Sequence, residues 1–277
     1  MSIPTWLRSG QAKVGVILTL IVLVVGVAGP WLAPHREAEL LGQTYGAADS
    51  VAPLGYDFLG RDVLSRTLHG GFSLIWMTVT AALAAMALGT AIGMLSGYLR
   101  GRVDQIVVWW ADVLLAFPNV VLILLVVSML GRSEWLIVAT VVLAFLPGVV
   151  RLARASTLEV VGQEYVEVAQ LLSYPAWRIL LREVLPNIAS PLLVHLGTML
   201  TWGVGILGAV SFLGYGVQAP AADWGLMINE NRAGMRIQPW AVVAPVFFIA
   251  PFALGTNSFA EGLSSRKLRG RSGKGTT

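Results

Sequence analysis

Long apolar runs with few charges are the feature that most constrains this chain. The runs occupy residues 14–32, 72–99, 106–130, 135–150, 188–216 and 240–262. A helix of about 20 apolar residues crosses a bilayer, and only structures that pair their backbone groups internally are stable there. Because 56% of the residues are hydrophobic and only 12% are charged, a water-soluble core could not hide the apolar surface. The sequence therefore predicts an all-α, polytopic membrane protein with six transmembrane helices.

The first run has two interpretations, because Arg8 and Lys13 precede it as basic residues precede a cleavable signal sequence. The run at 14–32 is longer than the roughly 7 to 15 residues of a signal core, and further apolar runs follow it. We therefore expect it to remain as the first span.

We expect one domain with three regions. Residues 1–71 hold the first span and an extracytoplasmic loop, residues 72–262 form the core around a polar loop at 164–187, and residues 263–277 form a basic tail. The tail places Gly275 after Lys274, where a phosphate-binding loop needs Ser or Thr. No other ATP-binding motif is visible, so the chain is expected to bind no cofactor.

The orientation follows from the basic residues. Three spans separate the polar stretches 35–71 and 151–187, which are therefore expected on opposite faces. Of the 19 Lys and Arg residues, 13 fall on the face that holds both termini. Because basic residues near span ends are retained in the cytoplasm, both termini and the 164–187 loop are expected there.

Composition also excludes some functions. The chain has no cysteine, which excludes disulfides, thiolate metal sites and a cysteine nucleophile. The net charge of +4 comes from short basic clusters between apolar runs, and topology explains these clusters better than nucleic acid binding does. Lipid is therefore the expected surrounding, and no nucleic acid partner is expected.

The loop at 164–187 has the pattern of two helices joined by a tight turn. Good helix formers run to Leu172, and Ser173-Tyr174-Pro175 then interrupts them. Proline suits the first turn of a second short helix, and Leu185-Pro186-Asn187 is expected to repeat this break before the fifth span. The apolar side chains expected on its surface are Leu171, Leu172, Tyr174, Trp177, Ile179 and Leu180.

Such a surface has two interpretations. A short amphipathic helix can bind in a hydrophobic groove of a partner protein, where a few apolar anchors supply most of the binding energy. The same helix could instead lie on lipid headgroups, with Arg178 and Arg182 facing phosphates.

The loop resembles a known element. Residues 165–173 (YVEVAQLLS), with 177–179 (WRI) and 185–187 (LPN), resemble the EAA loop of binding-protein-dependent ABC permeases. Ser173 and Val168 stand where that family usually has Gly and Ala. Further blocks resemble the C-type permease of the dipeptide, oligopeptide and nickel family: 54–66 (LGYDFLGRDVLSR), 103–104 (VD), 111–118 (ADVLLAFP), 211–218 (SFLGYGVQ) and 223–225 (DWG).

The resemblance implies a type I ABC importer permease in the bacterial cytoplasmic membrane, forming the pore and moving di- or oligopeptides, with nickel or another small solute as the alternative. It implies a second homologous permease, two ATPase subunits that hold ATP and Mg²⁺, and an extracytoplasmic binding protein. The loop's short helix would couple this chain to the ATPase. The implied coupling residues are Glu167, Val168, Ala169, Ser173, Tyr174, Pro175, Ala176, Trp177, Arg178, Leu185 and Pro186.

Two outer segments are candidates for docking of the binding protein. Arg61 and Asp62 lie in the first outer loop, and Asp223 and Trp224 lie in the last. An interfacial helix at 54–71 is the alternative interpretation of the first segment.

Two polar residues stand inside apolar runs. Asp112 is either a pore residue or a structural hydrogen-bonding group, because an ionised carboxylate is costly in a membrane. His195 has no second His or carboxylate three or four residues away, so a metal site is not expected and a structural role is favoured. Stripes of small residues in the second and fifth spans permit close helix packing and could also line a path.

Two other functional classes remain to be distinguished. An ion-coupled carrier acting alone would use Asp112 for coupling, and gradient-driven transport by the purified chain would support it. A membrane enzyme is disfavoured, because the sequence shows no nucleophile and base at a recognisable spacing.

Overall fold

The computed structural model describes the backbone of residues 10–272 and the side chains of residues 13–258. Throughout this part of the chain the regular elements are helices, which confirms the all-α prediction. The basic tail expected at 263–277 lies outside the described side chains, and the last helix continues to Ser272. The helices are α1 (Gly10–Leu32), α2 (Val63–Leu99), α3 (Gly101–Leu115), α4 (Asn119–Leu130), α5 (Glu134–Val161), α6 (Glu164–Leu171), α7 (Ala176–Ile179), α8 (Leu185–Phe212), α9 (Trp224–Asn231) and α10 (Trp240–Ser272).

Five segments are long and apolar enough to cross a membrane: α1, α2, α5, α10 and a continuous helical segment that runs from α7 through α8. The pair α3 and α4 passes the same test together, but its two axes meet at 84°. The expectation of one unbroken helix over the run 106–130 is therefore wrong. The count of six spans holds when this bent pair is taken as one broken span.

The break between α3 and α4 has a local cause. Pro118 has no N–H to donate, and its ring disfavours a helical conformation at Phe117. α3 accordingly ends at Leu115, and α4 begins at Asn119, directly after the proline. The apolar run 106–130 contains this proline, but hydropathy alone gives no sign that the helix breaks there.

Small residues bring α2 and α5 into close contact. A Cβ added at Gly93 would lie 2.6 Å from the Val150 carbonyl oxygen, and one added at Gly89 would lie 2.6 Å from Val149 Cβ. Close packing of the second span is therefore confirmed. In α8 the outcome is divided: a Cβ at Gly203 would lie 2.9 Å from Thr78 Cγ2, whereas a Cβ at Gly205 would meet no atom within 4 Å.

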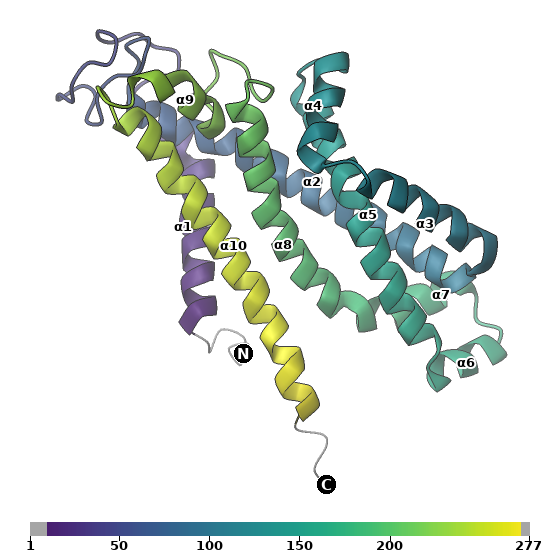
Figure 1. Ribbon diagram of the computed structural model, residues 1–277. Coiled ribbons are helices and arrows are strands. Elements are labelled where there is room, and N and C mark those ends of the chain that lie inside the picture. The colour runs from purple at the N-terminus through teal and green to yellow at the C-terminus, as the bar shows by residue number, and fades with distance from the viewer. Residues whose placement is uncertain (1–9, 273–277) are drawn as a thin grey trace.

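The two polar stretches lie at opposite ends of the helices, as the sequence predicted. In Figure 1 the loop that follows α1 and the short helix α9 gather at the upper end, and α6 and α7 lie at the lower right. α1 runs beside α10, and α8 stands between α10 and α5. We call the upper assembly of residues 33–62 and α9 the outer cap.

Candidate functional site

The turn after α6 closes that helix with a Schellman motif. The Tyr174 N–H donates to the Ala169 carbonyl at 3.2 Å, and the Ser173 N–H donates to the Gln170 carbonyl at 2.9 Å. Ser173 adopts φ = 58°, in the left-handed region that a glycine usually supplies. The serine therefore takes the glycine conformation itself, and the turn has the geometry that the family pattern implies.

The second half of the segment differs from the prediction. α7 begins after Pro175 and continues through a π-helical turn, Leu180–Val184, directly into α8. The break expected at Leu185-Pro186-Asn187 is absent, so that expectation is wrong. Pro186 is accommodated because it stands at the start of α8, directly after the wider π turn, where its missing N–H costs the helix little.

This continuous helix decides which side chains are exposed. Ile179 and Leu180, expected on the surface, are only 1% and 6% exposed, and Ala169 is also buried. They pack against Met94 of α2 and Ala153 of α5 in one apolar cluster. We call the exposed apolar set the lower patch; it consists of Tyr165, Val168, Leu171, Leu172, Tyr174, Trp177 and Leu181.

Charged side chains border the lower patch. Glu167 is exposed beside Val168, and Arg178 places its guanidinium carbon 4.2 Å from the centre of the Tyr174 ring. Such a cation–π contact at an exposed site contributes about 0.5 to 1 kcal/mol. Pro175, Ala176 and Pro186 are exposed, whereas Leu185 is partly buried. The patch is therefore a defined protein surface, and the buried side chains of the same segment pack against α2, α5 and α8.

The four residues expected to dock the binding protein are buried. Arg61, Asp62, Asp223 and Trp224 are each at most 2% exposed, so the prediction that these side chains form a docking surface is wrong. Both aspartates are N-caps. Asp62 accepts hydrogen bonds from the first backbone N–H groups of α2, and Asp223 does the same for α9.

Trp224 anchors the outer cap to the spans. Its indole N–H donates to the Thr67 carbonyl at 2.8 Å, and its ring stacks on Phe248 with the ring centres 5.4 Å apart. Asp223 also accepts a hydrogen bond from Ser73 Oγ at 2.9 Å. Complete burial raises the pKa of the Asp223 carboxyl group.

A buried charge cluster inside the outer cap was missed at the sequence level. Arg61 and Arg66 both donate to Glu230, at 3.1 and 3.0 Å, and Arg61 also pairs with Asp57 at 2.7 Å. Burial raises the pKa of Glu230, and the two guanidinium groups oppose that shift. No local pattern indicated this cluster, because Asp57 and Arg61 lie in a loop and Glu230 lies in α9, far away in the sequence.

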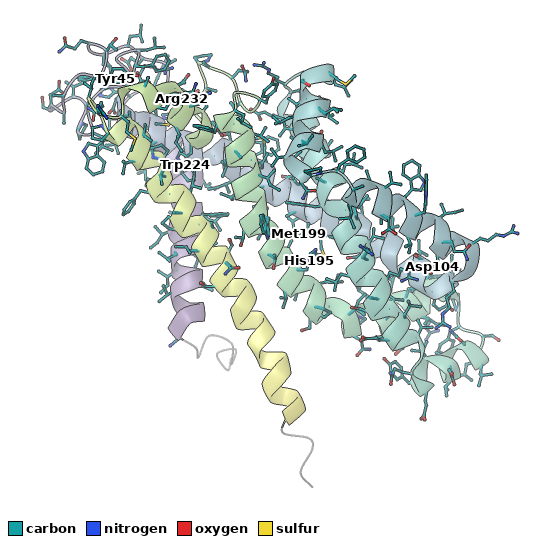
Figure 2. All side chains as sticks on the ribbon, viewed as in Figure 1. Tyr45, Asp104, His195, Met199, Trp224 and Arg232 are labelled. Carbon is teal, nitrogen blue, oxygen red and sulfur yellow. The ribbon has the colours of Figure 1, made fainter. Side chains whose placement is uncertain are left out.

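The two polar residues of the apolar runs also have defined surroundings. Asp112 is about half exposed and pairs with Arg151 of α5 at 3.5 Å. Figure 2 shows His195 and Met199 midway along α8, far from Trp224 at the outer cap. Among the residues with described side chains, no group of three His, Asp or Glu residues could hold a metal ion.

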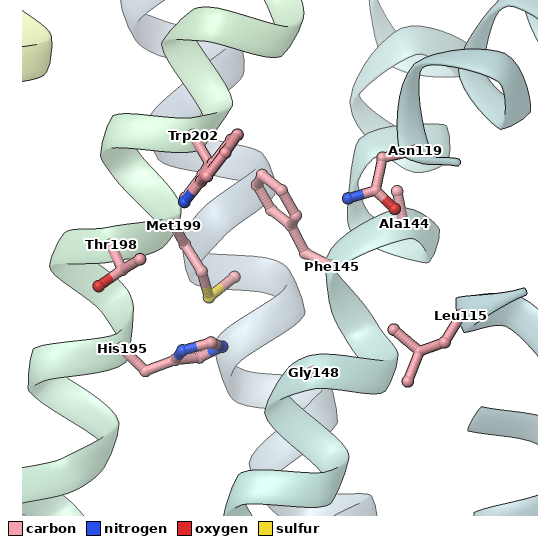
Figure 3. A pocket seen from close by; sticks show the side chains of 9 residues that line it. All are labelled: Leu115, Asn119, Ala144, Phe145, Gly148, His195, Thr198, Met199 and Trp202. Atoms are coloured by element: carbon pink, nitrogen blue, oxygen red, sulfur yellow. The ribbon is translucent and has the colours of Figure 1, made fainter. Parts of the chain in front are cut away.

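His195 lines a cavity of about 310 Å³, shown in Figure 3. The cavity lies between α8, α5 and the junction of α3 with α4. Its lining residues are Leu115, Asn119, Ala144, Phe145, Gly148, His195, Thr198, Met199 and Trp202.

These features define a class of protein: a polytopic helical membrane protein with an anchored patch at one end of its spans and a tightly built cap at the other. Comparison with known proteins identifies the family within that class. The family of the binding-protein-dependent transport system inner membrane component matches residues 89–269, a range that includes the 164–187 segment. The chain belongs to this family and is an ABC transport permease.

Individual relatives cover most of the chain. It is 31% identical to the glutathione transport system permease protein GsiD of Pectobacterium atrosepticum, over 93% of this chain and 86% of the relative. It is 31% identical to the dipeptide transport system permease protein DppC of Haemophilus influenzae, over 91% and 88%. The oligopeptide transport system permease protein OppC of the same species is 29% identical, over 90% and 80%.

Proposed function

We propose that this permease imports small peptides, most simply dipeptides, across the bacterial cytoplasmic membrane. The relatives that cover nine-tenths of the chain are named for dipeptide, oligopeptide and glutathione transport, and all three solutes contain peptide bonds. The chain supplies the membrane path and performs no chemical reaction. A binding protein on the outer side delivers the peptide.

The partners follow from the same proposal. Two ATPase subunits hold ATP and Mg²⁺, a second homologous permease completes the pore, and this chain binds no cofactor. The observation that carries the coupling role is the lower patch, with Leu171 83% and Trp177 63% exposed. An exposed apolar patch of this kind, rimmed by charge and anchored from below, is suited to seat in a groove of a partner.

The lower patch then faces the cytoplasm, as do the start of α1 and the end of α10, which lie toward the same end in Figure 1. The excess of basic residues on this face supports that orientation. The outer cap faces the binding protein. Its contact surface consists of side chains other than the buried Arg61, Asp62, Asp223 and Trp224.

Replacement of both Glu167 and Trp177 by Ala tests the coupling role. In proteoliposomes that hold the complete importer, the variant is expected to remain inserted in the membrane but to lose most of the ATP hydrolysis that the loaded binding protein stimulates. Removal of one aromatic anchor from an interface typically costs about 2 kcal/mol or more, which weakens the affinity of the contact about thirtyfold.

A matched control exists at the opposite end of α5, where Glu134 is followed by the exposed Trp135. Replacement of this pair by Ala removes the same chemistry and is expected to leave stimulated hydrolysis unchanged. Wild-type hydrolysis and peptide transport in the Glu167 and Trp177 variant would refute the coupling assignment.

A further inference from the structure

The cavity beside His195 joins three elements that are distant in sequence. α8 contributes His195, Thr198 and Trp202, α5 contributes Phe145 and Gly148, and the remaining wall comes from the break between α3 and α4. Figure 3 shows these side chains around one common space. The cavity therefore lies where the broken span α3–α4 meets α5 and α8. α5 leads into α6 of the lower patch, and α8 is continuous with α7.

Two polar side chains in this cavity have no hydrogen-bond partner among the described residues. Within the described side chains, neither the His195 ring nor the Asn119 amide makes a hydrogen bond to another residue. The Thr198 hydroxyl donates to the Val194 carbonyl at 3.3 Å within α8. Polar side chains in a membrane span are costly unless they face a partner or a water-filled path, so His195 and Asn119 point to such a path.

The residues of α8 that share this face form one stripe. Asn187, His195, Thr198, Trp202 and Gly205 recur at helical spacing and therefore point to one side of the helix. Trp202 is 65% exposed, and a Cβ at Gly205 would meet open space. Asn187, Trp202 and Gly205 are exposed on this side of α8, whereas His195 and Thr198 between them are partly covered where α5 lies across the cavity.

A residue larger than glycine at position 148 would fill part of the cavity. Gly148 stands opposite His195, and a Cβ at that position would lie 3.6 Å from His195 Nε2. A methyl group would fit in ordinary contact, whereas a leucine side chain would occupy the space between α5 and α8. Gly148 thus sets the width of the cavity.

We propose that this cavity is a contact site for the peptide during its passage through the pore. His195, Asn119 and Thr198 would hydrogen-bond the peptide's amide and carboxylate groups, and Phe145, Met199 and Trp202 would contact its side chains. A volume of about 310 Å³ lies within the range of ligand sites and is enough to hold part or all of a dipeptide. This inference rests on the proposed function, since it names where the imported solute is held.

The first experiment uses the absence of native cysteine, which allows single cysteines to be labelled without background in this chain. The complete importer is reconstituted with Thr198→Cys and treated with a cationic methanethiosulfonate reagent. We expect modification that blocks transport of L-alanyl-L-alanine. Leu193→Cys is the control, because Leu193 is 52% exposed on the same helix but does not line the cavity; its modification is expected to leave transport intact.

The second experiment measures peptide transported per ATP hydrolysed. His195→Ala and Gly148→Leu are expected to lower this ratio about tenfold, the effect of losing one hydrogen bond to the solute or of filling its space. ATP hydrolysis stimulated by the loaded binding protein should persist, because the lower patch is unchanged. Leu193→Ala should retain the wild-type ratio.

The outcomes separate this inference from the proposed function. If the wild-type importer does not move L-alanyl-L-alanine, the assignment of dipeptides as the solute and the inference both fail. If wild type transports the dipeptide and both cavity variants transport it equally well, only the inference fails. It also fails if Thr198→Cys resists the reagent and instead forms a disulfide with a cysteine in the second permease, because a partner helix would then fill the cavity.

Discussion

Arg154 of α5 donates two hydrogen bonds to Asp104 of α3, from Nε to one carboxylate oxygen and from Nη2 to the other. Ser96 of α2 donates a third bond to the same carboxylate at 2.6 Å. One side chain thus connects three spans beside the segment that carries the lower patch. A second Asp–Arg pair links α3 to α5, but Asp112 and Arg151 are 3.5 Å apart and each is about half exposed.

These two pairs allow a matched test of stability. Asp104→Asn removes the charge that holds Arg154, whose side chain is only 29% exposed, and is expected to destabilise the fold by about 2 kcal/mol. Asp112→Asn breaks an exposed pair and is expected to cost less than about 0.5 kcal/mol. Thermal unfolding in detergent should show a clearly lower midpoint for the first variant only. Equal midpoints would contradict the prediction.

Asp112→Asn also distinguishes two modes of transport. The exposed pairing with Arg151 gives Asp112 a minor structural role, so ATP-driven uptake of L-alanyl-L-alanine by the complete importer should remain within about twofold of wild type. An ion-coupled carrier would lose uptake when this carboxylate is removed. Uptake by the purified chain under an ion gradient, abolished by the substitution, would establish the carrier instead.

Ser173 provides a test of the turn below α6. An L-residue in the left-handed region costs about 1 to 2 kcal/mol, and Ser173 is exposed at φ = 58°. Ser173→Gly should therefore stabilise the segment by about 0.5 to 1 kcal/mol, after the entropy of glycine is subtracted. Ser173→Val should destabilise it by about 1 kcal/mol or more, because a β-branched side chain crowds this backbone conformation.

Hydrogen exchange of the α6 amides in the assembled importer measures this change locally. Protection is expected to increase with Gly and to decrease with Val. Lower protection in the glycine variant would show that the serine side chain, and not its backbone, holds the turn.

The burial of Asp223 makes the stability of the outer cap depend on pH. Burial raises the pKa of its carboxyl group above the ordinary value of 3.8, so the folded state holds the proton more tightly than the unfolded state does. The resulting stability is fully present below the ordinary value and is lost as pH rises through the folded pKa. Asp223→Asn keeps an oxygen that can cap α9 but cannot titrate.

The measurement is the unfolding midpoint of wild type and Asp223→Asn over a series of pH values. The midpoint of wild type should fall relative to that of the variant as pH rises. Parallel pH profiles would show that this carboxyl group does not titrate differently in the fold. Asp223→Ala serves as the capping control, because it should be less stable than Asp223→Asn at every pH.

Local patterns predicted the helical elements well. The apolar runs located the spans, and the Ser173-Tyr174-Pro175 sequence located the turn between α6 and α7. The two errors in helix continuity both involve proline. Pro118 breaks a run that hydropathy presented as continuous, whereas Pro186 is accommodated at the start of α8. The effect of a proline depends on whether the backbone groups around it can still form hydrogen bonds. A short sequence pattern does not predict this.

The sequence by itself determined the membrane class, the helices and the two opposite polar ends, because hydropathy and turn chemistry depend on neighbours along the chain. Only the tertiary structure decided which side chains are available. Arg61, Asp62, Asp223 and Trp224 are polar or amphipathic residues of outer segments, yet the fold buries all four. Burial depends on partners far away in the chain, as in the contact of Arg66 with Glu230, and so does the cavity beside His195, whose walls are separate helices.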